Sequence, residues 1–233
     1  MGGSDQWGNI TAGVDLARRM DGAHLHALTH PLVTRSDGVK LGKSADAGTW
    51  LAPEKTSPYQ FFQWLMRIPD ADVPTFLRFY SFKSHEEILA LEEETVRSPE
   101  ARAGQRAIAR EITLLVHGED GLHAAERATA ALFGGSLEGL SEADLLDIFS
   151  DVPSITVTAA RLSAGIAAPE AFVDAGLAKS RGEARKLLDS GGGYANNVRI
   201  DADQILDSTH LATGTILVLR AGKRRFALVR ASG

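Results

Sequence analysis

The chain has 233 residues, 44% of them hydrophobic, which allows one large domain or two small ones. No stretch approaches the roughly 20 apolar residues of a membrane helix. The first residues lack the basic and apolar regions of a signal peptide. The sequence has no cysteine, which excludes disulfides and thiolate metal sites. We therefore expect a cytoplasmic protein with no membrane partner.

The net charge of −5 is unevenly distributed along the chain. Residues 169–233 carry ten Lys/Arg and seven Asp/Glu, which gives +3 there and −8 in the rest of the chain. This asymmetry favours a polyanionic partner for the C-terminal part, with chance clustering of charge as the alternative.

The first predicted helix follows a segment rich in glycine, residues 2–9. Apolar residues recur at helical spacing from Ile10 to Met20, and Asp21-Gly22 ends the helix. Asp5 and Gln6 therefore lie where a loop meets a helix N-terminus, a place that offers backbone N–H groups and a positive dipole end. Asp5 can cap the helix, accept a hydrogen bond from a ribose hydroxyl, or do both, and a cap is the simpler interpretation of a lone residue.

A strand is predicted over residues 23–33. It would place His24, His26 and His30 on one face. A metal site is one interpretation of three histidines, but a fourth ligand is not evident. We favour partly buried polar side chains, or one histidine that contacts a ligand.

The predicted strand leads into a short basic loop, residues 33–44. Lys40 and Lys43 each lie beside a glycine, and Ser44 follows the second lysine. Such a loop suits charge stabilisation at phosphate oxygens, whereas the alternative is a solvated turn with two surface lysines. A P-loop is excluded, since its first glycine would have to stand at Asp37.

Residues 53–151 are predicted to be helical. Expected helices begin at Ser57-Pro58, after Ser84 with Glu87 as a capping box, at Ser98-Pro99 with an end at His117-Gly118, and over residues 122–133 and 142–149. Aromatic residues between Phe61 and Phe82 could stack on bases, but their helical spacing favours a core. This region shows no catalytic pattern.

Residues 152–168 are predicted to be a linker, with a possible short strand at 155–157. Beyond Pro169 we expect short helices over 170–175 and 181–188, the second with Ser180 and Glu183 as a capping box, and strands over 194–198, 216–219 and 226–229. Basic residues gather around the second helix and the last turn: Lys179, Arg181, Arg185, Lys186, Lys223, Arg224 and Arg225. A basic helix beside a basic hairpin favours a surface that follows RNA phosphates, and the alternative is a solvated α+β domain with surface arginines.

Three blocks of the sequence resemble bacterial tyrosyl-tRNA synthetases. The first block is Gly2-Gly3-Ser4-Asp5-Gln6-Trp7-Gly8-Asn9-Ile10. The second block, Lys40-Leu41-Gly42-Lys43-Ser44, is similar to the class I loop called KMSKS. As in the family, this loop is followed by Glu54-Lys55-Thr56-Ser57-Pro58-Tyr59. The third, residues 175–185, resembles the S-four-type RNA-binding motif that ends those enzymes. Leu41 departs from the aromatic residue often found in the loop, which should alter packing and leave the charge unchanged.

The resemblance implies a mixed α and α+β fold. Residues 1–52 would end a class I, Rossmann-type catalytic domain, residues 53–151 would form an α-helical domain that approaches the anticodon arm, and residues 169–233 would form a small S-four-like RNA-binding domain. It also implies a tyrosine–tRNA ligase that uses ATP with Mg²⁺, tyrosine and tRNA-Tyr and forms a homodimer. No protein-bound metal is expected.

The resemblance also assigns roles to the candidate site residues. Gly3 and Asp5 would border the ribose of the adenylate, and Gln6 would lie near the tyrosyl carboxyl group. Lys40 and Lys43 would stabilise the α-phosphate and the departing pyrophosphate, with Ser44 supporting the loop. The C-terminal basic residues would bind tRNA.

The family's HIGH motif and most of its nucleotide-binding fold are not found in this sequence, and His24-Leu25-His26 is no substitute. We therefore expect a C-terminal portion that is inactive alone. A stand-alone RNA-binding protein derived from a synthetase is the alternative. The related tryptophanyl enzyme fits less well, because of the first block and the RNA-binding tail.

Overall fold

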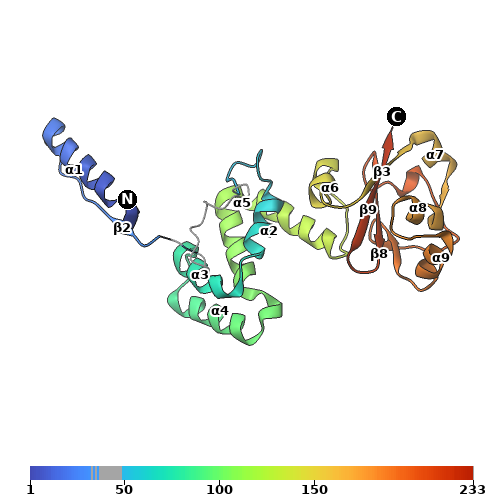
Figure 1. The fold of residues 1–233 in the computed structure, drawn as a ribbon, viewed down its shortest axis with the longest axis horizontal. Coiled ribbons are helices and arrows are strands. Elements are labelled where there is room, and N and C mark those ends of the chain that lie inside the picture. The colour runs from blue at the N-terminus through green and yellow to red at the C-terminus, as the bar shows by residue number, and fades with distance from the viewer. Residues whose placement is uncertain (33, 35, 37–48, 233) are drawn as a thin grey trace. The chain divides into compact units, whose positions relative to one another are not determined.

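A computed structural model describes the whole chain except residues 33, 35, 37–48 and 233 (Figure 1). The chain divides into two compact units. One comprises Met1–Thr49 with Arg67–Ile108, and the other comprises Trp50–Met66 with Ala109–Gly233. In the part of the chain that the structure describes, no helix has both the length and the apolar character to cross a membrane.

The first unit begins with the predicted glycine-rich turn and helix. Strand β1 (Gly2–Gly3) runs into a 3-10 turn, η1 (Ser4–Gln6), and then into α1 (Trp7–Asp21). Gly22 ends α1 in the left-handed conformation, with φ of 64° and its N–H donated to Arg18 O at 3.1 Å. The helix prediction is confirmed, and α1 buries none of its residues.

The predicted strand over residues 23–33 is wrong for most of its length. Only Thr29–His30 forms a strand, β2, which pairs in parallel with Gly2 and Gly3. Because β1 offers two residues for pairing, β2 can extend no further against it. His24 and His26 lie in irregular backbone, and His30 Nδ1 lies 2.9 Å from Pro31 O.

The rest of the first unit is helical. After η2 (Asp70–Asp72) come α3 (Val73–Tyr80), α4 (His85–Arg97) and η3 (Pro99–Ala101). The predicted capping box before α4 is confirmed, since Glu87 N donates to Ser84 Oγ and Ser84 N donates to Glu87 Oε2. Val73 and Leu77 are fully buried where α3 packs on α4.

The aromatic residues between Phe61 and Phe82 divide between core and surface. Phe61, Phe62 and Phe76 are buried, as expected, while Phe82 is 80% exposed. Trp64, Phe79 and Tyr80 are also exposed in part. The core interpretation therefore holds for the first three residues only.

The second unit contains the helices α2 (Pro58–Met66) and α6 (Glu142–Ile148) and, from Ala109 onwards, most of α5 (Ala103–Leu132). Ser57 caps α2 as predicted, because its Oγ accepts the N–H of Gln60 at 3.1 Å. The predicted break at His117-Gly118 is also present. Gly118 has φ of 71° and ψ of −176°, so α5 is two helical stretches joined by a kink.

A five-stranded sheet organises the C-terminal part of the second unit (Figure 1). Its strand order is β3 (Ser154–Thr158), β9 (Arg225–Ser232), β8 (Ile216–Ala221), β5 (Gly193–Ala195) and β6 (Val198–Arg199). The stretch predicted to be a linker belongs to this fold. Strand β3 pairs in parallel with β9 over its whole length, and α7 (Ala159–Ala164) and β4 (Ile166–Ala167) follow it. Alternating Ile155 and Val157 suit a strand once β9 provides a partner.

The strand predicted over residues 194–198 is a hairpin. Asn196 and Asn197 have φ of 50° and 64°, and Ala195 pairs with Val198 across them. Asparagine tolerates the left-handed conformation that a two-residue hairpin requires, so the chain reverses there. The remaining elements are α8 (Ala168–Asp174), α9 (Arg181–Asp189), β7 (Ile205–Leu206), which pairs with β4, and η4 (Ser208–His210).

Both faces of the sheet are covered. On one face Leu217 and Leu219 belong to a core with Phe172 of α8 and Leu188 of α9. On the other, alternate residues of the same strands, among them Val218, pack with α6 and the end of α5. Because successive side chains of a strand point to opposite faces, β8 contributes to both cores.

Candidate functional site

The first group of candidate residues lies at the carboxyl end of β1. Gly3 ends the strand, Asp5 and Gln6 form η1, and α1 follows at once. A Cβ on Gly3 would lie 2.6 Å from Leu32 Cδ2 and 2.9 Å from Asp5 Oδ1, so a larger residue here would have to displace those two side chains. Both polar residues are exposed, and Gln6 Oε1 accepts a hydrogen bond from Asn9 Nδ2 at 2.9 Å.

The expectation that Asp5 caps the helix is not met. The N-cap of α1 is Gln6, whose own side chain makes no capping hydrogen bond, and the N-cap of η1 is Gly3. The start of α1 lies shortly after a parallel strand, a place that suits an anionic ligand such as a nucleotide phosphate, although the N–H of Trp7 already donates to Ser4 O. The residues present are compatible with ATP at this edge.

The basic loop itself lies outside the described residues, including Lys40, Lys43 and Ser44. One described residue within it, Ser36, donates its backbone N–H to Asp72 Oδ1 at 2.5 Å. Asp72 lies in η2 and is only 3% exposed. The carboxylate of Asp72 therefore holds the chain at the start of this loop.

The predicted RNA-binding residues gather at one end of the C-terminal sheet. Lys179 lies in the turn before α9, and Arg181, Arg185 and Lys186 lie on that helix. Two hydrogen bonds bring the β8–β9 turn to the same place: Arg225 Nη1 donates to Leu177 O at 3.0 Å, and Gly222 N donates to Gly192 O at 2.7 Å.

The N-terminus of α9 differs from the predicted capping box in one bond. Ser180 Oγ accepts the N–H of Glu183 at 3.2 Å, as expected. The carboxylate of Glu183 accepts the N–H of Lys179 at 2.9 Å instead of that of Ser180. Glu183 thus fixes the turn that carries Lys179.

The basic residues fall into two groups that differ in pairing. Arg181 binds Glu170 at 2.8 Å, and Arg185 lies 3.2 Å from Asp203. Arg225 forms no ion pair with a described residue either, but it donates to Leu177 O. Four further exposed cations form no ion pair with any described residue: Lys179, Lys186, Lys223 and Arg224. The second group is the stronger candidate for contact with a polyanion, because no carboxylate has to be displaced.

Glu170 is the centre of the paired group. Its Oε1 accepts from Arg161 Nη2 at 2.9 Å and its Oε2 accepts from Arg181 Nη2 at 2.8 Å. Arg161 also donates to Asp174 at 2.6 Å. The carboxylates of Asp174 and Glu170 raise the pKa of Arg161 above its usual value.

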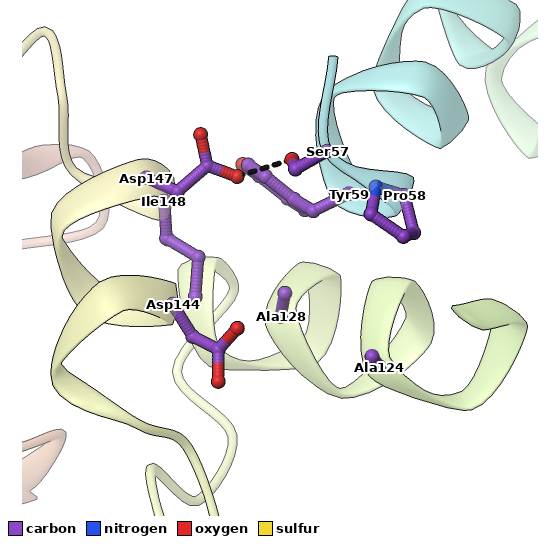
Figure 2. Close-up of a pocket in the computed structure, with 8 residues that line it drawn as sticks. All are labelled: Ser57, Pro58, Tyr59, Ala124, Ala128, Asp144, Asp147 and Ile148. Carbon is purple, nitrogen blue, oxygen red and sulfur yellow. Dashed lines mark hydrogen bonds between the residues drawn. The ribbon is translucent and has the colours of Figure 1, made fainter. Parts of the chain in front are cut away.

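A small hollow lies between the start of α2, α5 and α6 (Figure 2). Its volume is about 40 Å³, enough for a few waters and too small for a nucleotide. Asp147 of α6 accepts hydrogen bonds from the Ser57 hydroxyl and from Gln60 Nε2, so one carboxylate ties α6 to the start of α2. This hollow lies where the three helices pack together, and we assign it no catalytic role.

No metal site is evident in the described part of the chain, where no three His, Asp or Glu side chains are grouped to hold an ion. His24, His26 and His30 are thus not gathered into a site. Sequence reasoning missed Asp72, which accepts the N–H of Ser36 in the basic loop, 36 positions away along the chain. It also missed Glu170 and Asp203, which pair with the candidate residues Arg181 and Arg185. No local spacing signals such pairs.

The chain matches known proteins over nearly its whole length. Residues 1–134 match the family model described as tRNA synthetases class I (W and Y), and residues 144–229 match the tyrosine–tRNA ligase SYY-like C-terminal domain. The tyrosine–tRNA ligase of Roseiflexus castenholzii is 47% identical over 98% of this chain and 54% of its own length. That of Opitutus terrae is 45% identical over 99% of this chain and 55% of its own length.

Among solved structures, the C-terminally truncated mitochondrial tyrosyl-tRNA synthetase of Aspergillus nidulans matches with a TM-score of 0.44 and 30% identity, covering 56% of this chain and 38% of that one. The chain spans about half the length of the curated relatives it matches. The two matched models together cover both ends of the sequence, and the chain belongs to the class I tRNA synthetases, in the family of the tyrosine–tRNA ligases.

Proposed function

We propose that the chain is the C-terminal half of a tyrosine–tRNA ligase, and that it binds tRNA-Tyr through the end of its C-terminal sheet. One observation carries the RNA-binding part: four exposed cations without a carboxylate partner among the described residues, Lys179, Lys186, Lys223 and Arg224, lie at one end of the domain that matches the ligase C-terminal model. Phosphate contacts of this kind give affinity without reading sequence.

At the other end of the chain, the proposed partner is the adenylate. Gly3 and Asp5 would border the ribose and Gln6 the tyrosyl carboxyl group. Lys40 and Lys43 would stabilise charge on the α-phosphate and pyrophosphate of ATP, with Ser44 supporting the loop, and Mg²⁺ would share that charge. The close approach of Leu32 and Asp5 to Gly3 and the position of Asp5 and Gln6 between a parallel strand and the start of α1 support this placement. A Rossmann-type first domain, an S-four-like last domain and a homodimer remain predictions implied by the family.

The RNA-binding proposal is tested by measuring tRNA-Tyr affinity against salt concentration. Each phosphate contact contributes a slope of about −0.9 in a plot of log affinity against log salt for a duplex. Lys223→Ala and Arg224→Ala should each make the slope shallower by about one contact and weaken binding at low salt.

Arg230→Ala is the matched control. It removes one exposed cation from β9, the strand that follows the turn, five residues beyond Arg225 and about 17 Å further along that strand. Its slope should equal that of the unchanged chain. Equal slopes for all four proteins, or an affinity that does not change with salt, would refute the proposed surface.

An assay of tyrosine activation distinguishes the ligase from the alternative, a stand-alone RNA-binding protein. A polypeptide of these 233 residues should show no tyrosine-dependent exchange between ATP and pyrophosphate, because the matched ligases are about twice as long. The same polypeptide joined to the upstream half of the Roseiflexus castenholzii ligase should regain exchange, and Lys43→Ala should then slow it by about a hundredfold or more. Exchange that is restored but insensitive to Lys43→Ala would contradict the assigned role of the loop.

A further inference from the structure

A hollow of about 280 Å³ opens beside the paired arginines of the C-terminal domain. It is some twenty times larger than the space that one buried water needs, so it can hold a ring-sized group. Its lining comes from the starts of α8 and α9 and from the segment after β6: Ala167, Pro169, Glu170, Arg181, Arg185 and Ala202.

The polar wall of this hollow is pre-formed. Arg161 and Arg181 hold the two oxygens of Glu170 from different sides, at 2.9 and 2.8 Å. A carboxylate oxygen has two lone pairs, so each oxygen of Glu170 can accept one more hydrogen bond. Arg185 supplies further N–H donors, since its single contact with Asp203 at 3.2 Å uses one nitrogen.

The charges in and around the hollow favour a neutral occupant. Three arginines, Arg161, Arg181 and Arg185, face three carboxylates, those of Glu170, Asp174 and Asp203. A phosphate placed here would lie against Glu170 and would have to displace it or Asp203 from an arginine. A planar group with both donors and acceptors needs no such exchange.

We propose that this hollow binds an unpaired guanine base of RNA, an inference that rests on the RNA-binding function proposed above. Guanine carries two adjacent donors, N1–H and N2–H, that match the two oxygens of a carboxylate, and two acceptors, O6 and N7, that match a guanidinium. Glu170 would accept from the first pair and Arg185 would donate to the second. The apolar surfaces of Pro169 and Ala202 would contact the ring.

The other bases fit this pair of walls less well. Adenine and cytosine each place an acceptor nitrogen next to the amino group, where it would face Glu170. Uracil has a single N–H between two carbonyl oxygens, both of which the carboxylate would repel. The hollow should therefore distinguish guanine from the rest by hydrogen bonding, which is the usual basis for reading bases in single-stranded RNA.

The first test measures binding of the full 233-residue chain to a 12-nucleotide oligouridine and to the same oligomer with one central guanosine. The guanosine oligomer should bind about tenfold tighter, the discrimination expected of one bidentate base contact. Replacing that guanosine by inosine removes the N2 amino group and should give an affinity between the two. Equal affinity for all three oligomers would overturn the proposal.

Two variants locate the contact. Glu170→Gln keeps the shape but replaces one acceptor by a donor, so the guanosine preference should disappear. Asp189→Asn removes the same charge from an exposed position on α9 outside the hollow and should leave the preference intact. Arg185→Lys keeps its charge but loses the fork that binds O6 and N7 together, so it should reduce the preference for the guanosine oligomer over oligouridine. A preference that survives both Glu170→Gln and Arg185→Lys would refute the site.

Competition separates the base from its phosphate. Guanosine, which has no phosphate, should displace the guanosine oligomer, whereas inorganic phosphate at the same concentration should not. The reverse result would mean a phosphate site and would overturn the proposal. If salt-sensitive RNA binding is present but shows no base preference, this inference fails while the proposed function stands; if no RNA binds at all, the proposed function itself fails.

Discussion

Helix α1 and the C-terminal sheet both follow a clear apolar periodicity, but only the sheet buries it. In α1, Leu16 is 57% exposed and Met20 is 72% exposed, and no residue of the helix is buried. In β8, Leu217 and Val218 are at most 1% exposed, although they point to opposite faces. The difference lies in what covers each element, since α6, α8 and α9 pack on the sheet.

The comparison teaches that periodicity predicts an element and the face it will bury, but not the partner that buries it. The spacing of Ile10, Val14 and Ala17 is sufficient to predict α1. Its stability still depends on packing, because a helix of 15 residues is marginal in water without a tertiary partner. The two regions should therefore differ most in local stability.

Hydrogen exchange should show the largest contrast between them. Strands β8 and β9 each have a neighbouring strand on both sides within a buried sheet. The hydrogen bonds of their amides should therefore open only when the domain unfolds. We expect protection factors there at least about 10³-fold higher than in α1, measured by mass spectrometry on the 233-residue chain. Comparable protection in both regions would show that α1 is stabilised by contacts that its exposed surface does not reveal.

A pair of core and surface truncations should give the next largest effect. Phe172→Ala removes a fully buried ring from the core shared by α8 and the sheet, and it should cost about 3–5 kcal/mol of unfolding free energy in urea. Leu16→Ala removes an exposed side chain from α1 and should change the free energy by less than about 0.5 kcal/mol. A large loss for Leu16→Ala would contradict the exposed state of α1.

Local signals explain how much of the fold could be predicted from the sequence. Caps at Ser57 and Ser84, the break at Gly118 and the last two strands were predictable, because each depends on a few neighbouring residues. The strand at 154–158 was predicted only over 155–157, and its place in the sheet was not predictable, since its partner β9 lies some 70 residues later. The hairpin at Asn196-Asn197 was missed, although paired asparagines are a turn signal.

The candidate RNA-binding surface also combines predictable local features with contacts between distant parts of the chain. The sequence placed Arg181 and Arg185 on a helix correctly, but it gave no sign that Glu170 and Asp203 would pair with them. Those carboxylates come from other elements and reach the arginines only through the tertiary fold. Fewer of the predicted basic side chains are therefore available to a polyanion than the sequence suggested.

Two glycine substitutions should have opposite signs. A Cβ on Gly193 would lie 2.2 Å from Leu188 Cδ2 and 3.3 Å from Phe172 Cζ, so Gly193→Ala should destabilise the C-terminal domain by roughly 1–3 kcal/mol. A Cβ on Gly13 would meet nothing within 4 Å, so Gly13→Ala should strengthen α1 by up to about 1 kcal/mol. Thermal unfolding reports the first and helix circular dichroism the second. A decrease in helicity for Gly13→Ala would mean that α1 packs against a surface close to that residue.

The smallest expected effect concerns Asp207, a carboxylate at the surface of the C-terminal domain that is held by several hydrogen bonds. Its Oδ1 accepts hydrogen bonds from the Thr209 hydroxyl at 2.6 Å, from His210 Nδ1 at 3.0 Å and from Thr209 N at 2.9 Å, and these lower the pKa of Asp207 from 3.8 to about 2. Because the folded pKa is depressed, the stabilisation is fully present above the usual carboxyl pKa and is lost as the pH falls through about 2. Thr209→Val removes the largest of these contributions, so the pKa of Asp207, followed by carbon NMR of its carboxyl group, should rise towards 3.8 without reaching it. Ser208→Ala is the control, and its Asp207 should titrate as in the unchanged chain. An unaltered titration in Thr209→Val would mean that His210 and the backbone alone hold the carboxylate in its charged form.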